Sequence, residues 1–377
     1  MAVAVTKQPN NYSFAGNPIV FELSGDTSEP VRVEIMSGNE SKYATYYPFM
    51  SGDLYKIRMD LSDYLYFEAK PDIPESETII TPVAGFSSAY RIKMFSGEYK
   101  ENPVMFYQFE GIAFHGGISN QALQTLSESG FDIFTYRLSS CFEQFLFTAR
   151  TNSKEIKLKK MELYPFIFIH PGCSIVFKSD SGNEITAEIQ PEGTVCAMDI
   201  KAVLDQMPES TKRIDVCPQG EYAFHFIIEQ GKITGEKYLI RFRNSIGAFE
   251  MLEVTGRALH APEFLEENTY NTLTGFDFYE EHRSRMKTKG IIEVETGYKE
   301  RREFPFILDL IKSDESYFIY PDGTSFRCNI SAENVKFRHL MTEPTSFLLK
   351  IKEVAEEEFS TPEFYRIFDD TFDETYN

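Results

Sequence analysis

Val31-Arg32-Val33-Glu34-Ile35 is the stretch that decides the fold. Its apolar and charged residues alternate, and successive side chains of a strand point to opposite faces of a sheet. The stretch therefore predicts a strand with one buried face and one solvated face. Runs of this kind recur along the chain, separated by turn signals such as Ser24-Gly-Asp and Asp322-Gly. This pattern is typical of antiparallel β-sandwiches.

Short matches recur in the same order in two parts of the chain and indicate an internal repeat. The matched pairs are Ile19-Val20-Phe21 with Ile175-Val176-Phe177, Val33-Glu34-Ile35 with Ala187-Glu188-Ile189, Met59-Asp60-Leu61 with Met198-Asp199-Ile200, Pro74-Glu75-Ser76 with Pro208-Glu209-Ser210, residues 79–82 with 215–218, and the strand at Tyr90 with the one at Tyr222. In the third pair, we expect Asp60 and Asp199 to cap a short helical turn that plugs the end of a sandwich.

We therefore expect a mostly β protein with two tandem immunoglobulin-like or fibronectin-like sandwiches and a third, β-rich α+β domain. The expected ranges are 8–111 for the first sandwich, 112–130 for a connector with a helix over 119–129, 131–257 for the second sandwich, 258–355 for the third domain with one short helix, and 356–377 for a C-terminal arm. The hairpin that ends at Gly256 is expected to close the second sandwich.

Composition narrows the function classes. The chain has 377 residues, 58 of them acidic and 38 basic, and a net charge of -20. Nucleic-acid binding needs a basic face, so this charge argues against it and also disfavours docking on an anionic membrane. The N-terminus shows no secretory pattern and the five cysteines are odd in number, so we expect synthesis in the cytoplasm, without a signal peptide or membrane insertion.

The sequence predicts a protein that is not an enzyme. It contains no G-x-S-x-G, P-loop, H-E-x-x-H or G-x-G-x-x-G motif. Residues of zinc-ligand type are present, but they include no Cys-x-x-Cys pair, so we expect neither a metal nor a cofactor. These residues are His170, Cys173, Cys196, Cys217 and His225.

The C-terminal arm is the first candidate for partner binding. Thr361-Pro362-Glu363 is a helix-start signal, and Phe364, Phe368 and Phe372 then recur every four residues with Tyr365 beside them. One interpretation is an acidic helix that docks on its own third domain. The other is an arm that inserts into a neighbouring subunit or another protein partner.

Tyr43, Tyr46 and Tyr47 form the second candidate. An exposed tyrosine cluster on a β-sandwich suits glycan binding, because aromatic rings stack on sugars. The chain contains no Trp, so only Tyr or Phe could supply such a stacking platform. The alternative function is therefore a cell-surface adhesin or carbohydrate-binding protein.

Three segments resemble tail-region proteins encoded by phages and prophages of Bacteroidetes. They are residues 9–21, with Asn17-Pro18-Ile19, residues 238–250, with the pattern Asn-x-x-Gly and then aromatic-Glu, and residues 308–313. Phe249 stands where members of that family commonly carry Trp. The resemblance implies a structural tail or baseplate component of a virion or tail-like assembly, with self-association or other tail subunits as partners and no catalytic residues.

Overall fold

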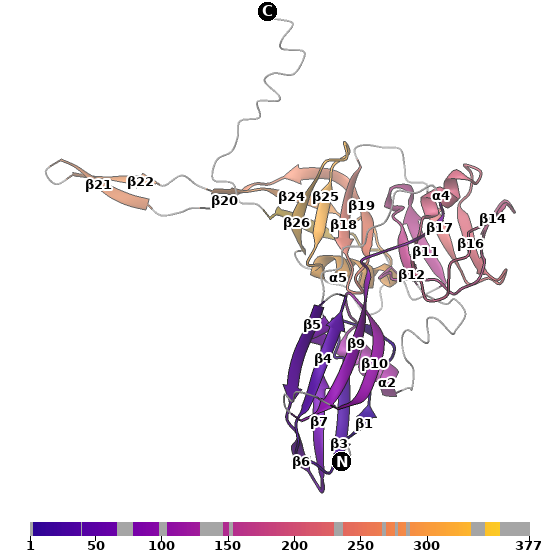
Figure 1. The fold of residues 1–377 in the computed structure, drawn as a ribbon. Coiled ribbons are helices and arrows are strands. Elements are labelled where there is room, and N and C mark those ends of the chain that lie inside the picture. The colour runs from indigo at the N-terminus through magenta and orange to yellow at the C-terminus, as the bar shows by residue number, and fades with distance from the viewer. Residues whose placement is uncertain are drawn as a thin grey trace, which may run out of the picture. The chain divides into compact units, whose positions relative to one another are not determined.

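The computed structural model describes residues 3–38, 40–65, 78–97, 104–128, 146–150, 154–229, 237–265, 269–275, 278–283, 287–332 and 344–354. The described chain is mostly β, as expected, with several sheets, a closed barrel and short helices (Figure 1). Contacts divide the chain into two compact units. One unit comprises residues 1–233, 243–251 and 305–309, and the other comprises 234–242, 252–304 and 310–377.

Two sheets at the N-terminal end share one hydrophobic core, and we call them the N-terminal sheet pair. Their strand orders are β1-β3-β7-β6 and β2-β10-β9-β4-β5, with β2 parallel to β10. The strands are β1 (Ala4–Lys7), β2 (Tyr12–Phe14), β3 (Val20–Gly25), β4 (Val31–Ser37), β5 (Glu40–Tyr46), β6 (Phe49–Ser51), β7 (Leu54–Asp60), β9 (Ser87–Ser96) and β10 (Met105–Phe114). Val31, Val33 and Ile35 are buried in this core, whereas the charged residues between them are partly exposed, which confirms the predicted alternation.

A second pair of sheets, the central sheet pair, follows. Their strand orders are β11-β17-β16-β13-β14, with β11 parallel to β17, and β12-β15-β8. The strands are β8 (Ile80–Pro82), β11 (Glu155–Lys159), β12 (Phe166–Ile169), β13 (Ile175–Ser179), β14 (Glu184–Thr186), β15 (Val195–Met198), β16 (Arg213–Pro218) and β17 (Phe224–Glu229), with the 3₁₀ turn η1 (Lys160–Glu162) after β11.

The strand β8 corrects the expected boundary of the first sandwich. It precedes β9 in the chain, yet it pairs with β15 of the central sheet pair. Ile79 and Ile80 are buried in the central core, and that burial places β8 there. The range 8–111 therefore does not form a module by itself.

The repeated Met-Asp segments occupy equivalent places in the two sheet pairs. Each one ends a strand, β7 or β15, and leads into a short helix, α1 (Ser62–Leu65) or α4 (Ile200–Asp205). The Ser62 N–H donates to the Asp60 carboxylate at 3.0 Å, and the Lys201 N–H donates to Asp199 at 2.8 Å. The predicted caps are therefore confirmed.

The other matched segments do not occupy equivalent strands. Ile19-Val20-Phe21 leads into β3 of a four-stranded sheet, whereas residues 175–177 belong to β13 of a five-stranded sheet. The pair 79–82 and 215–218 is divided in the same way between β8 and β16, and residues 187–189 follow β14. Tyr90 lies in β9 and Tyr222 precedes β17, and these strands hold different places in their sheets. The match at 74–76 lies outside the described residues. These matches therefore do not identify a strand's place in its sheet.

The third sheet system is a closed barrel of order β18-β19-β24-β27-β26-β25. Its strands are β18 (Tyr238–Arg243), β19 (Phe249–His260), β24 (Ile291–Glu295), β25 (Ser316–Ile319), β26 (Ser325–Ala332) and β27 (Leu348–Glu353). The helices η2 (Arg301–Glu303) and α5 (Phe304–Lys312) lie between β24 and β25 along the chain. The hairpin of β18 and β19 was expected to close the second sandwich. It instead belongs to the barrel, because β18 pairs with β25 and β19 with β24.

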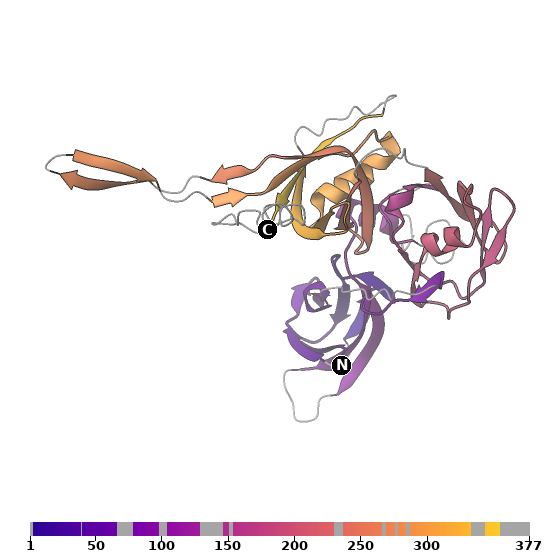
Figure 2. The same ribbon diagram turned by 90° about the horizontal axis from the view of Figure 1, so that it is seen from above.

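Between β19 and β24 the chain forms β20 (Glu263–Leu265), β21 (Thr269–Gly275), β22 (Phe278–Arg283) and β23 (Lys287–Lys289). These strands make two two-stranded sheets, and Figure 2 shows β21 and β22 running side by side. The helix α2 (Asn120–Glu128) falls where the connector helix was predicted. Within the described residues, no helix combines the length and the apolar character needed to cross a membrane.

Candidate functional site

The two predicted binding sites have different outcomes. Phe364, Tyr365, Phe368 and Phe372 lie outside the described residues, so their role stays a prediction. Tyr43 and Tyr46 lie on opposite faces of β5, because they pair with the partly exposed Glu34 and the buried Val31 respectively. The structure therefore does not gather the tyrosines into one platform.

Tyr46 packs against the core of the N-terminal sheet pair, and burial raises the pKa of its hydroxyl to about 12. Tyr47 follows the end of β5 and is 66% exposed. Of the three predicted tyrosines, only Tyr43 is presented by the outer face of the five-stranded sheet.

Tyr43 is fixed on that face by charged neighbours. The Arg32 guanidinium lies 4.8 Å from the centroid of the Tyr43 ring and 5.8 Å from that of Phe95. The Tyr43 hydroxyl donates to Glu34 at 2.9 Å, and this hydrogen bond raises the pKa of the hydroxyl. Lys93 lies 3.5 Å from the same carboxylate. Tyr43 is thus a 54% exposed aromatic ring with a hydrogen bond to Glu34 and a cation–π contact with Arg32.

A pocket of about 560 Å³ opens beside this face. Its lining includes Tyr12, Met36, Ala89, Arg91, Glu110 and Ile112. Arg91 and Glu110 form an ion pair of 2.7 Å whose two side chains are about half exposed. The pocket joins apolar surface to one charged pair, which is a composition that suits a small polar ligand.

The residues of zinc-ligand type are dispersed. Burial raises the pKa of the Cys196 thiol to about 12 and lowers the pKa of His170. His225 contacts the Tyr222 hydroxyl at 2.6 Å and Glu155 at 3.5 Å. Across the described ranges, no three His, Cys, Asp or Glu residues are grouped in a way that could hold a metal ion.

The most elaborate arrangement is a junction that sequence reasoning did not identify. We use the word for the contacts among residues 14–17, 114–118, 147–150 and 244–250, all of which belong to the first compact unit. Phe147 lies at its apolar centre, with ring centroids 4.9 Å from Phe86, 5.3 Å from Phe114 and 6.4 Å from Phe14. Ile246 belongs to the same buried cluster. One buried cluster therefore joins residues of the N-terminal sheet pair to residues 147–150 and to the 244–250 turn.

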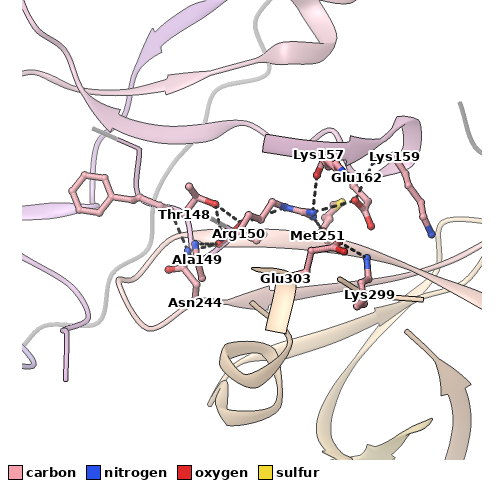
Figure 3. Close-up of polar contacts among 12 residues, drawn as sticks. Thr148, Ala149, Arg150, Lys157, Lys159, Glu162, Asn244, Met251, Lys299 and Glu303 are labelled. Atoms are coloured by element: carbon pink, nitrogen blue, oxygen red, sulfur yellow. Dashed lines mark hydrogen bonds and ion pairs between the residues drawn. The ribbon is translucent and has the colours of Figure 1, made fainter. Parts of the chain in front are cut away.

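Arg150 lies at the polar side of the junction and is buried (Figure 3). Its guanidinium donates to Glu162 at 3.2 Å and to the Met251 carbonyl, and it lies 3.5 Å from Glu250. Its other side faces the Phe306 ring at 4.3 Å. Its guanidinium also donates to the Lys157 carbonyl at 3.4 Å. One buried cation is thus shared by two buried carboxylates, a ring face and two main-chain carbonyls.

The Glu250 carboxylate accepts hydrogen bonds from three other residues of the chain. It accepts from the Ala149 N–H at 2.7 Å, from the Asn244 amide at 2.7 Å and from the Thr148 hydroxyl at 2.8 Å. Burial raises the pKa of this carboxyl, while Arg150 and the three donors oppose the rise. Charge-assisted hydrogen bonds of this kind fix the positions of the segments that carry them.

Main-chain contacts complete the junction. The Gly117 N–H donates to the Ser245 carbonyl at 2.7 Å, and the Ser245 N–H donates to Asp309 at 2.9 Å. Asn17 donates to the Ile118 carbonyl and accepts from the Ile118 N–H, both at 2.8 Å. Gly116 has a φ of +86°, and a Cβ there would lie 2.5 Å from the Ser245 carbonyl oxygen. Glycine is therefore required for this close approach.

Comparisons with known proteins leave the family open. No family model matches the chain, and no curated protein matches it. Among solved structures, the periplasmic chaperone SfaE matches over 61% of this chain and 100% of its own, at 8% identity and a TM-score of 0.19. The CsuC–CsuE chaperone–tip adhesion subunit pre-assembly complex of Acinetobacter baumannii Csu pili covers 53% of this chain and 91% of its own, at 9% identity and a TM-score of 0.17. Scores this low do not indicate a common fold.

The chemistry of the junction is structural. The oxygens of Glu250 and the guanidinium of Arg150 are occupied by groups of the chain itself. The sequence does carry signals for it, namely Gly116-Gly117 and the turn Asn244-Ser-Ile-Gly247. Each signal predicts a local turn, but neither predicts that the two turns meet.

Proposed function

We propose that this chain is a non-enzymatic structural subunit of a phage or prophage tail or baseplate, with two immunoglobulin-like sandwiches followed by a β-barrel domain. One observation carries the proposal. The three segments that resemble tail-region proteins supply residues to a single place, the junction and its hydrogen-bonded neighbour Asp309.

The correspondence extends to individual residues. Asn17 comes from the Asn-Pro-Ile segment, and its side chain holds Ile118 through two hydrogen bonds. Asn244 and Glu250 come from the Asn-x-x-Gly, aromatic-Glu hairpin, and Asp309 comes from the helical segment. These motif residues join segments of the chain, which is the role expected of a scaffold rather than of a catalyst.

A rigid junction suits a subunit that transmits load or holds a fixed place in a symmetric assembly. Subunits of this kind associate through closed rotational symmetry and bury large surfaces. Negative-stain electron microscopy of the purified full chain is therefore expected to show uniform closed particles. Fields of separate single chains would contradict the proposal.

Carbohydrate binding is the second candidate, and the outer face of the N-terminal sheet pair favours it. Tyr43 is held by Arg32 on the same sheet face as Met36 and Arg91 of the pocket. An aromatic ring beside an ion pair can stack on a sugar and hydrogen-bond its hydroxyls. A glycan array is the test. Specific binding that is lost in Tyr43→Ala but kept in Tyr222→Ala, another exposed tyrosine, would support this candidate.

A further inference from the structure

The pocket beside the outer face of the five-stranded sheet is hollow because small residues lie at its centre. Ile112 and Ala89 are a directly opposed pair on β10 and β9, and Gly38, which has no side chain, directly follows β4. Tyr12 pairs with Ile112 on one side, and Met36 is supplied by β4 on the other. The hollow of about 560 Å³ thus lies among larger, partly buried apolar side chains.

One ion pair supplies the charged groups of this pocket. Arg91 Nε donates to Glu110 Oε1 at 2.7 Å, and Gln108 Nε2 donates to the same oxygen at 3.3 Å. Among the described residues, the side chains of Arg91 and Glu110 make no other hydrogen bond. The two Nη atoms of Arg91 and Oε2 of Glu110 are therefore left as donors and an acceptor for a ligand.

The charges of the lining favour a neutral ligand. Arg91 and Glu110 are the only charged residues in the described lining, and their charges cancel. A phosphate or carboxylate would meet the Glu110 carboxylate on a chain whose net charge is -20, and a cation would meet the Arg91 guanidinium.

Two neighbouring hydroxyl groups match the pair in both respects. A hydroxyl can accept from a guanidinium and donate to a carboxylate, so a vicinal diol can use both members of the pair without adding charge. The C–H face of a sugar ring can then lie against the Tyr12 ring or Met36.

We propose that this pocket binds one residue of a neutral saccharide through a vicinal diol held by Arg91 and Glu110. The volume of about 560 Å³ falls within the roughly 300–1,000 Å³ of small-molecule sites. The inference goes beyond the proposed assembly function, and it gives the carbohydrate-binding candidate a defined site.

Tyr43 is placed to contact a longer saccharide. Arg91 pairs with Met36, and Tyr43 pairs with Glu34, so Arg91 and Tyr43 are two strands and two residues apart on one face. At about 4.8 Å per strand and about 3.3 Å per residue, these positions lie about 12 Å apart. Tyr43→Ala should therefore weaken the binding of an oligosaccharide more than that of its terminal monosaccharide.

Saturation-transfer NMR of the purified full chain tests the inference. The probes are glucose, galactose, mannose and N-acetylglucosamine, and we expect saturation transfer to at least one of them. Ala89→Phe fills the hollow from an exposed position and should abolish the signal. Ala89→Ser, which leaves the hollow open, should keep it.

The ion pair is tested with the sugar that binds. Arg91→Met should weaken the binding of that sugar about tenfold or more, because a charged hydrogen-bond donor is lost. The matched control is Arg213→Met, which breaks a pair of the same length, 2.7 Å to Asp215, on the central sheet pair. The control should leave the affinity unchanged.

Saturation transfer to none of the four probes overturns the inference, and so does a signal that Ala89→Phe leaves unchanged. The native mass of the same samples separates this inference from the proposed function. Closed particles that bind no sugar overturn the inference and leave the assembly function standing. A monomer whose sugar signal is lost in Ala89→Phe supports the inference and overturns the assembly function.

Discussion

Arg150 is the residue on which the junction depends most. It is 8% exposed and lies between Glu162 and Glu250, which are 3% and 4% exposed. A buried ion pair adds little over an apolar replacement of the whole group, but removing one partner leaves the other charge buried without compensation. The removal of Arg150 leaves two such charges.

Arg150→Met should therefore destabilise the protein by about 3–5 kcal/mol near neutral pH. The matched control is Arg91→Met, which also removes an arginine beside a glutamate, but at a pair that is about half exposed. The control should cost less than about 1 kcal/mol, because water screens exposed pairs. Urea unfolding of both variants measures the difference in the free energy of unfolding. Equal losses of stability would contradict a special structural role of Arg150.

The cysteines give a second prediction at the residue scale. Cys196, Cys217 and Cys328 are buried, and burial raises the pKa of each thiol, to about 12 for Cys196 and Cys328. The thiolate is the reactive form, so a raised pKa lowers the reactivity at pH 8. Cys173 is only partly buried.

Maleimide labelling of the native protein, followed by peptide mapping, should modify Cys173 and spare Cys196, Cys217 and Cys328. In urea, all five cysteines of the chain should react. Labelling of Cys196 in the native state at the rate seen in urea would show that the central core is open.

At the scale of elements, the decisive event is the docking of the 244–250 turn against residues 115–118. Gly116 and Gly182 have nearly the same backbone angle, φ +86° and +85°, but different surroundings. A Cβ at Gly116 would meet the Ser245 carbonyl, whereas a Cβ at Gly182 would meet nothing within 4 Å. Substitutions at Gly182 therefore measure the backbone strain alone, and substitutions at Gly116 measure the strain together with the contact to the 244–250 turn.

Gly182→Ala should cost about 1–2 kcal/mol, the usual price of a left-handed alanine. Gly116→Ala should cost about 1–3 kcal/mol more, because the added methyl forces the two turns apart. Thermal unfolding of the two variants tests this difference. Equal shifts of the midpoint would mean that the turn is not held against Gly116.

Local elements were largely predictable from the sequence. The alternation at Val31 to Ile35, the caps at Asp60 and Asp199, and the connector helix α2 all follow from side-chain periodicity or capping chemistry within a few residues. Pairing between distant strands was not predictable in this way. The sequence of β8 indicates a strand, but only the buried Ile79 and Ile80 in the central core reveal which sheet it joins.

At the scale of the whole molecule, contacts between distant segments were also not predictable, and for this reason the sequence did not predict the junction. Asn17, Asn244 and Glu250 each look like an ordinary turn or edge residue in the sequence. Their importance depends on segments about 100 residues away, such as the Ile118 partner of Asn17 and the Ala149 partner of Glu250. Contacts of that span are set by tertiary packing, and local propensity does not encode them.

We propose that the whole chain is one subunit of a larger assembly, in which the junction joins segments that are about 100 residues apart in the sequence. The native mass of the full chain, measured by native mass spectrometry across the micromolar range, tests this claim most directly. We expect one species at an integer multiple, greater than one, of the 43.5 kDa chain mass. A 43.5 kDa monomer at every concentration would contradict the account.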